Sequence, residues 1–260
     1  MKITVFTSNQ PRHLSYIARL ASIATEVYAV MEVTTVFPGK VKDFFDNSET
    51  MRSYFTRVQA AETRIFGGVG FTPSNVKVLP VKSGDLNFLL RKDLSEAMES
   101  DYFLVFGSSY IKGWLVQELV HKGAVNIHMG LSPYYRGSSC NFWALYDDRP
   151  AYVGATVHLL SEGLDSGPVL FHVRPDFYGQ DLFDFTMESV NAVQNRIVDE
   201  IQSGQIGERK PQFPESREQL RYTRDSDFDD QVALEFLERR YSDEHFLKLI
   251  GSGQQPHLIA

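Results

Sequence analysis

Three polar residues have types and spacing that could perform acyl-transfer chemistry. Asn126 and His128 lie two residues apart in the apolar run 124–128, and Asp165 follows 37 residues after the histidine. Side chains alternate along a strand, so the first two would emerge together on one face and point into solvent-accessible space. An amide can donate to an oxyanion without titrating, an imidazole can exchange a proton near neutral pH, and a carboxylate can orient that imidazole. The alternative interpretation is structural, since asparagine and histidine on a strand are commonly satisfied core groups.

The neighbouring sequence predicts how these residues are positioned. Residues 151–160 are typical of a second strand, which ends in the turn Ser161-Glu162-Gly163-Leu164-Asp165-Ser166-Gly167-Pro168. The near-continuous apolar run 101–106 predicts a buried strand that opens into a loop at 107–111. Ligands of parallel sheets lie beyond the carboxyl ends of the strands, so this loop and the Asn126/His128 strand should share one crevice.

The N-terminus predicts a strand at 2–7, a polar loop, and a helix that Pro11 opens. Its loop supplies hydroxyl, amide and cationic groups for binding the phosphate or a hydroxyl of an acceptor substrate: Ser8, Asn9, Gln10 and Arg12. The alternative for Asn9 is that it only caps the helix. The chain has no Gly-x-Gly-x-x-Gly and no P-loop lysine, so a dinucleotide site is not supported.

Strands and helices alternate through most of the chain, which predicts an α/β fold with a doubly wound, mostly parallel, Rossmann-like sheet. Further strands are expected at 27–33, 76–81 and 169–173, and helices at 51–66, 85–98 (capped by Ser83), 138–146 and 182–201. We expect a catalytic domain at 1–204 and a short helical appendage at 205–260, with helices at 229–241 and 243–250. The appendage carries an apolar stripe that should pack on the main domain, with a homodimer interface as the alternative: Phe236, Leu237, Phe246, Leu247 and Ile250.

Composition narrows the class of protein. The 260 residues are 43% hydrophobic and 23% charged, without an apolar run long enough for a membrane helix or a signal peptide at the start. A single cysteine, Cys140, cannot form an internal disulfide, which favours a cytoplasmic location. The net charge of −7 and the absence of a basic block argue against a nucleic-acid partner. The histidines show no metal-ligand spacing, so no metal is expected.

The run N-I-H-x-x-L-x-P-x-x-R-G, with the later aspartate of E-G-L-D-S-G, resembles the formyltransferase family that uses N10-formyltetrahydrofolate. The resemblance extends over about residues 1–205. It implies that Asn126, His128 and Asp165 are catalytic. The chain has Met129-Gly130 where the family usually has Pro-Ser after the histidine.

The resemblance also implies a folate site built mostly from backbone groups, with N10-formyltetrahydrofolate as co-substrate. Its residues would be Ser108, Ser109, Tyr110, Ile111, Lys112, Ser161, Glu162, Gly163 and Leu164. Phe142 and Trp143 are interpreted as core or wall residues beside it.

The acceptor is left open by the residues themselves. The resemblance is greatest to sugar N-formyltransferases of the GDP-perosamine type, which implies a nucleotide-linked 4-amino-4,6-dideoxy sugar for O-antigen or related glycans. Methionyl-tRNA formyltransferases are expected to carry a longer, basic C-terminal domain, whereas this tail is short and acidic. Glycinamide ribonucleotide enzymes usually end near the helix expected at 182–201, and formyltetrahydrofolate hydrolases carry an extra N-terminal domain. A formyltransferase acting on another amine, and a non-catalytic nucleotide-sugar-binding protein, remain the alternatives.

Overall fold

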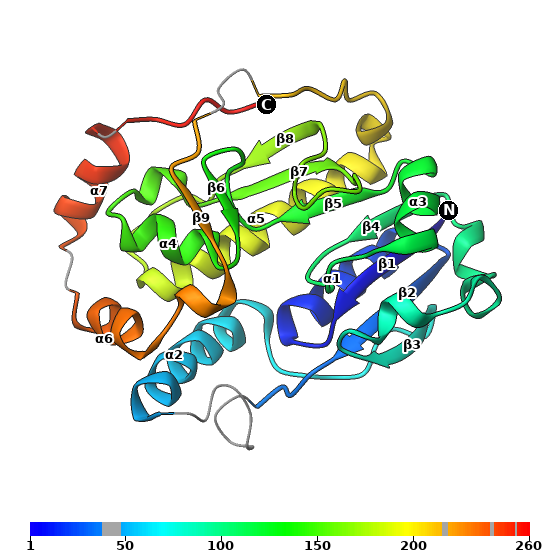
Figure 1. Ribbon diagram of the computed structural model, residues 1–260, viewed down its shortest axis with the longest axis horizontal. Helices are drawn as coiled ribbons and strands as arrows, with labels where there is room; N and C mark the ends of the chain where they lie inside the picture. The colour runs from blue at the N-terminus through cyan, green and yellow to red at the C-terminus, as the bar shows by residue number, and fades with distance from the viewer. Residues whose placement is uncertain (38–47, 215–217, 240–241, 253) are drawn as a thin grey trace.

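Apolar strand residues build a seven-stranded sheet that crosses the molecule (Figure 1). The computed structural model describes residues 1–37, 48–214, 218–239, 242–252 and 254–260. The strands are β1 (Lys2–Ser8), β2 (Glu26–Val33), β3 (Val76–Lys82), β4 (Tyr102–Val105), β5 (Val125–His128), β7 (Ala155–Leu159) and β8 (Val169–Val173), in the order β3-β2-β1-β4-β5-β7-β8. The first five are parallel to one another, and β7 and β8 are antiparallel to their neighbours. This confirms the predicted doubly wound, mostly parallel sheet, whose switch point lies between β1 and β4.

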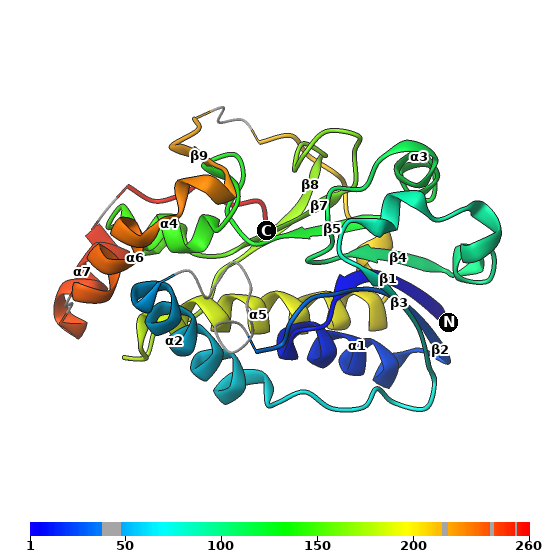
Figure 2. The same ribbon diagram turned by 60° about the horizontal axis from the view of Figure 1, so that its bottom comes forward.

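Helices cover both faces of the sheet (Figures 1 and 2). Beneath it in Figure 2, α1 (Pro11–Ile23) lies alongside the long α5 (Leu182–Gln202), and α2 (Glu49–Phe66) packs against α5. On the other face lie α3 (Gly113–His121) and three 3₁₀ turns, while α4 (Cys140–Tyr146) packs near the start of α5. The sheet is therefore the middle layer of three.

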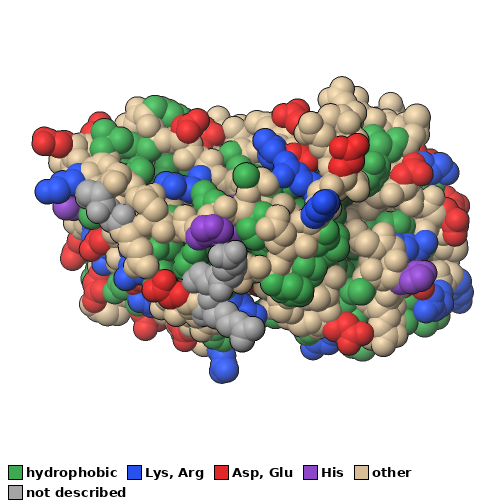
Figure 3. Space-filling model, turned by 90° about the horizontal axis from the view of Figure 1, so that it is seen from above, with side chains coloured by type: hydrophobic (Ala, Val, Ile, Leu, Met, Phe, Trp, Pro, Cys, Tyr) green, Lys and Arg blue, Asp and Glu red, His purple; other side chains and the backbone are tan. Residues whose placement is uncertain are grey.

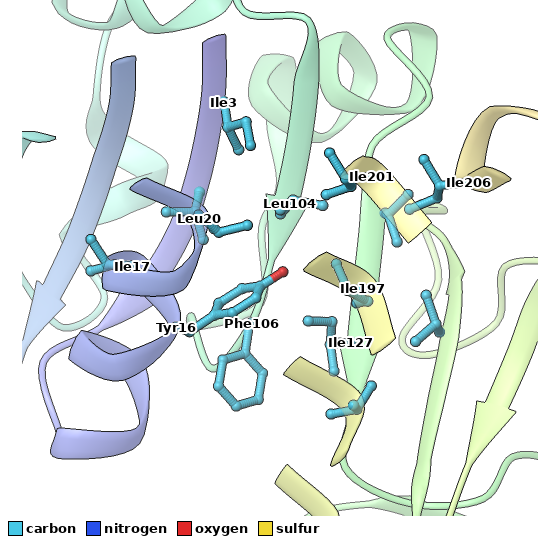
Figure 4. Close-up of a cluster of buried hydrophobic side chains, with 14 of the residues drawn as sticks. Ile3, Tyr16, Ile17, Leu20, Leu104, Phe106, Ile127, Ile197, Ile201 and Ile206 are labelled. Carbon is cyan, nitrogen blue, oxygen red and sulfur yellow. The ribbon is translucent and has the colours of Figure 1, made fainter. Parts of the chain in front are cut away.

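Successive side chains of a strand point to opposite faces of the sheet and pack in two different hydrophobic clusters. Ile3 and Val5 of β1 join the cluster under α1 and α5, whereas Phe6 joins the cluster under α3. Figure 4 shows the first cluster, in which the buried ring of Tyr16 from α1 lies beside Leu104 of β4 and Ile197 of α5. Period-two burial of this kind is what a sheet covered on both sides requires.

The C-terminal part of the chain shares a core with the sheet domain. A third cluster joins residues of α2 and α4 to Phe236 of α6 (Asp230–Glu238) and Phe246 of α7 (Asp243–Ser252). In addition, β9 (Arg221–Thr223) pairs in parallel with β6 (Tyr135–Gly137), a contact that the sequence did not predict. The predicted packing of the apolar stripe is confirmed for the two phenylalanines, but Leu247 is 52% exposed, so the stripe does not bury all its members.

Two predicted elements are wrong in their form. The helix expected at 85–98 is instead three 3₁₀ segments (Asp85–Phe88, Arg91–Leu94 and Ala97–Glu99), and Gly84 rather than Ser83 precedes the first. The carboxylate of Asp93 accepts from the backbone N–H of Leu90, and such local bonds compete with an α-helix.

The strand expected from residue 151 begins only at Ala155, because Pro150–Tyr152 form a 3₁₀ turn that Pro150 opens. The helix predicted from 138 begins at Cys140, and residues 240–241 of the one predicted at 229–241 lie outside the described residues.

Two buried tyrosines allow a test of what a hydroxyl contributes to this core. Tyr16 has no hydrogen-bonding partner for its hydroxyl among the described residues, and Tyr135 donates its own to Asp147 at 3.0 Å. Removing an unpaired buried hydroxyl relieves a desolvation cost, whereas removing the hydroxyl of Tyr135 loses a hydrogen bond to a carboxylate that Arg221 continues to bind. We expect Tyr16→Phe to raise the free energy of unfolding by about 1 kcal/mol and Tyr135→Phe to lower it by at least that amount. Urea denaturation of both variants measures the difference, and equal losses of stability would contradict the assignment.

Candidate active site

Strand β5 presents Asn126 and His128 on the face opposite its core residues. Val125 and Ile127 belong to the cluster under α1 and α5, as the alternation predicted. In the antiparallel pairing with β7, Asn126 lies opposite His158. The two predicted residues therefore share one face of a strand that is held on both sides by neighbours.

The loop after β7 brings Asp165 to the same point. Its Oδ2 lies 3.2 Å from Nδ1 of His128, and its Oδ1 lies 3.4 Å from Nδ2 of Asn126. The residue has a φ of +46°, and a side chain at Gly167 would place its Cβ 1.8 Å from the carbonyl oxygen of Leu159. This tight turn explains why glycine follows the aspartate in the Asp165-Ser166-Gly167 sequence.

His158 completes the cluster and was not identified from the sequence. Its Nδ1 lies 2.8 Å from the carbonyl oxygen of Leu159, so this nitrogen carries the proton and Nε2 is an acceptor. Nδ2 of Asn126 lies 2.9 Å from that Nε2, which fixes the amide of Asn126 with its N–H groups on the Asp165 side. The strand that carries His158 was predicted, but only its register against β5 reveals the pairing.

Burial and neighbouring groups set the protonation states of His128 and Asp165. His128 is only 8% exposed, so the expectation that its side chain points into solvent is wrong, although it still lines a cavity. Burial lowers the pKa of His128 below its ordinary value of 6.5, even though Asp165 works in the opposite direction. Burial also raises the pKa of Asp165, but the attraction of His128 and His158 outweighs it, and the pKa lies below its ordinary value. At neutral pH the site therefore holds a neutral imidazole beside a carboxylate.

This neutral imidazole is arranged to take up a proton. His128 faces two acceptors, Oδ2 of Asp165 at Nδ1 and the carbonyl oxygen of Tyr135 at Nε2, 3.3 Å away. A neutral ring has one N–H and can satisfy only one of them, whereas an imidazolium satisfies both. The geometry thus stabilises the protonated product of a general-base step.

The glycine at position 130, where the formyltransferase family usually has serine, packs closely against Cys140. A Cβ at Gly130 would lie 2.5 Å from Cβ of Cys140 and 2.8 Å from Nε2 of His128. Sγ of Cys140 itself lies 3.5 Å from that nitrogen. Cys140 thus occupies the space that a serine side chain at position 130 would need, so the two positions fit each other.

The three predicted catalytic residues open onto a cavity of about 490 Å³. It lies beyond the carboxyl ends of β4 and β5 and extends between α1, α2, α4 and α5. Ser108, Leu164 and Met129 line it near the cluster, and Phe142 lines its wall as expected. Trp143 is buried but is not among the lining residues, which fits its interpretation as core. This volume is typical of a small-molecule site.

The two segments predicted to hold the folate lie next to each other. The hydroxyl of Tyr110 donates to the carbonyl oxygen of Glu162, which links Ser108–Lys112 to Ser161–Leu164. Asn87 fixes the first segment by accepting from N–H of Lys112 at 2.7 Å and donating to the carbonyl oxygen of Tyr110 at 2.9 Å.

A buried carboxylate fixes the first segment from its other side. Glu32, 2% exposed, accepts from the backbone N–H of Ser109 and, at 2.8 Å, from its hydroxyl. Of the nine predicted folate residues, Ser108 and Leu164 line the cavity and the other seven lie outside it: Ser109, Tyr110, Ile111, Lys112, Ser161, Glu162 and Gly163.

The predicted acceptor loop is largely satisfied by contacts within the chain. The hydroxyl of Ser8 donates to the carbonyl oxygen of Glu32 at 3.0 Å, and the amides of Asn9 and Gln10 both contact Thr34. The alternative that Asn9 caps α1 is wrong, because Gln10 holds the N-cap position and no side chain caps from there. Arg12 alone of the four lines the cavity.

The described residues show no group of three or more His, Cys, Asp or Glu side chains that could hold a metal ion. Within the same ranges, no helix combines the length and apolarity needed to span a bilayer. Acidic and basic side chains are interspersed on the face seen in Figure 3, with hydrophobic side chains between them.

Known proteins resemble this chain in sequence and in fold. Residues 91–200, which include the whole polar cluster, match the family described as formyl transferase. A curated methionyl-tRNA formyltransferase from Thermodesulfovibrio yellowstonii is 27% identical over 119 residues, which cover 46% of this chain. The match spans only 37% of that relative's own length.

Solved structures match nearly the whole chain at low identity. The 4-N formyltransferase from Francisella tularensis superposes with a TM-score of 0.54 at 17% identity, covering 98% of this chain and 88% of that one. The formyltransferase PseJ from Anoxybacillus kamchatkensis, solved with UDP-4,6-dideoxy-4-formamido-L-AltNAc and tetrahydrofolate, gives 0.50 at 17% identity, covering 98% of this chain and 100% of that one. The described chain therefore has the fold of solved formyltransferases, and its residues 91–200 match the formyl transferase family.

Proposed function

We propose that the protein transfers the formyl group of N10-formyltetrahydrofolate to the amine of a nucleotide-linked 4-amino-4,6-dideoxy sugar. The observation that carries this proposal is the convergence of Asn126, His128 and Asp165 on one cavity, within a segment that matches the formyl transferase family. The sugar acceptor is supported by the fold neighbours, one of which holds a formamido sugar nucleotide and tetrahydrofolate. GDP-perosamine is our leading candidate, on the resemblance of the sequence.

The reaction needs a donor for an oxyanion and an acceptor for a proton. The attacking amine forms a C–N bond to the formyl carbon, the C–O double bond opens to an oxyanion, and the bond to N10 then breaks to release tetrahydrofolate. One N–H of Asn126 is used by His158, and the second makes only the 3.4 Å contact to Asp165, so this second N–H is available to donate to an oxyanion that lies on the same side. His128 takes the proton that the amine loses and returns a proton to the departing nitrogen.

Asp165 supports this cycle by remaining charged. It faces the imidazolium that forms on His128, and a carboxylate at 3.2 Å favours the charged ring. The cavity wall around the pair is mostly apolar, which strengthens this attraction relative to water.

A methionyl-tRNA acceptor is the second candidate, because the curated relatives with the matching sequence have that name. The net charge of −7 and the mixed charges in Figure 3 favour a small acceptor over a polyanion.

Removing the donor or the base should stop catalysis without unfolding the protein. We expect Asn126→Ala and His128→Ala to lower turnover by about 10²–10³, the usual loss when a positioned oxyanion donor is removed. Initial rates of product formation measure this, with the unfolding midpoint checked in parallel. His121→Ala, at the exposed end of α3, is the matched control and should keep wild-type turnover. Near-normal turnover in either site variant would rule out the mechanism.

The pH dependence of kcat/KM should report His128 in its neutral form. Because burial lowers the pKa of His128, activity should fall on the acid side with a midpoint below 6.5. Asp165 raises that pKa, so the residual activity of Asp165→Asn should have its midpoint at a still lower pH. A wild-type midpoint above 6.5, or an upward shift in the variant, would contradict these roles.

The acceptor can be identified with a panel of purified amines. We expect dTDP-, UDP- or GDP-linked 4-amino-4,6-dideoxyhexoses to be formylated, with GDP-perosamine preferred, and glycinamide ribonucleotide and methionyl-tRNA not to be. The salt dependence separates the acceptor classes: a diphosphate held by few donors gives a shallow slope of log(kcat/KM) against log[salt], and a tRNA a slope of about −6 or steeper. Formylation of the tRNA with that steep slope would replace the sugar proposal, and rapid deformylation of the folate without any amine would indicate a hydrolase.

A further inference from the structure

The cavity wall beyond the polar cluster is aromatic. The rings that line it among the described residues include Tyr54 and Phe55 from α2, Phe142 from α4, Phe183 from α5, Phe228, and Phe236 from α6. They pack on one another, with ring centroids 4.9 Å apart for Tyr54 and Phe228 and 4.8 Å apart for Phe142 and Phe236. Residues on both sides of position 204 therefore build one wall, which offers apolar faces to whatever enters.

Few charged side chains line the cavity. Among the described residues that line the cavity, Arg12 and Asp165 are the charged ones. Asp165 is committed to His128, which leaves Arg12 as the described lining cation that could meet a phosphate.

Glu62 already occupies the place where an anion would bind Arg12. Its Oε1 accepts from the guanidinium of Arg12 at 2.8 Å and from the backbone N–H of Arg12, in the first turn of α1, at 3.1 Å. Glu62 is only 4% exposed, so its carboxylate lies behind the cavity wall and not in solvent. A carboxylate at a helix N-terminus takes the position that phosphate groups favour, and a second anion there would be repelled.

We propose that the acceptor places an uncharged ring with an apolar face in this cavity and keeps its phosphates outside, with Glu62 excluding an anionic group from the N-terminus of α1. This rests on the proposed function, because it assumes that the acceptor amine reaches Asn126 and His128 through the aromatic part of the cavity. In this proposal the Ser8–Arg12 loop holds the site's structure and does not bind the phosphates of the acceptor.

The first test compares two acceptors on the wild-type enzyme. They carry the same nucleotide and the same 4-amino group, but one has a methyl and the other a hydroxymethyl group at C6 of the sugar. A hydroxyl buried against aromatic rings without a partner is disfavoured, so kcat/KM should be lower for the hydroxymethyl sugar, on the order of 100-fold. Equal values, or a preference for the hydroxymethyl sugar, would overturn the apolar assignment.

The second test measures binding of inorganic phosphate by titration calorimetry and needs no formyl transfer. Glu62→Gln keeps an acceptor for the backbone N–H of Arg12 but removes the charge, so phosphate should bind at least about 10-fold more tightly than to the wild type. Asp184→Asn is the matched control, because it frees Arg64 of α2 from a carboxylate away from the cavity. It should bind phosphate as the wild type does. Equal phosphate affinity in the wild type and both variants, or equal gains in the two variants, would overturn the role of Glu62.

The two tests separate the inference from the function on which it rests. If neither sugar is formylated but Glu62→Gln gains phosphate affinity, the sugar acceptor fails and the exclusion of anions by Glu62 stands. If the sugars are formylated with no preference at C6 and Glu62→Gln gains nothing, the proposed function stands and this inference fails.

Discussion

The contact between the carboxylate of Asp165 and the imidazole of His128 is the constraint around which the site is built. An ionised carboxylate loses hydration when it is buried, and only close polar partners offset that loss. Asp165 finds them in His128 and Asn126, which both come from β5. The left-handed backbone of Asp165 and the close approach of Gly167 to β7 are the local strain that brings the carboxylate to that point.

Strand pairing in the sheet fixes the positions of these side chains. β5 is paired on both sides, parallel to β4 and antiparallel to β7, so the positions of Asn126 and His158 are set by ladder hydrogen bonds as well as by side-chain packing. The antiparallel pairing of β5 with β7 also places His158 opposite Asn126. The amide orientation of Asn126 thus depends on the register of two strands, and an error of one residue would turn His158 to the other face.

Sequence reasoning reached the three central residues because strand alternation and motif spacing are local properties. The shared face of Asn126 and His128 follows from the period of two along a strand, and the resemblance to the formyltransferase family joins Asp165 to them. His158 was missed because its role depends on cross-strand register, which no local pattern reveals. The helix expected at 85–98 failed for a related reason: Asn87 binds the distant segment at Tyr110–Lys112, and that tertiary contact holds the chain in short turns.

Contacts between residues distant in sequence also explain why the loop predicted to bind the acceptor is occupied by contacts within the chain. Ser8, Asn9, Gln10 and Arg12 have the right types and the right place in a doubly wound fold to hold a phosphate. What decides their role is Thr34 and Glu62, which are 24 to 50 residues away in sequence and take up their hydrogen-bonding groups. Glu62, on α2, accepts from both the guanidinium and the backbone N–H of Arg12 at the start of α1. A carboxylate buried behind a cavity is costly unless it is paired, so the pairing of Glu62 with Arg12 and the helix N-terminus depends on the packing of α2 on α1.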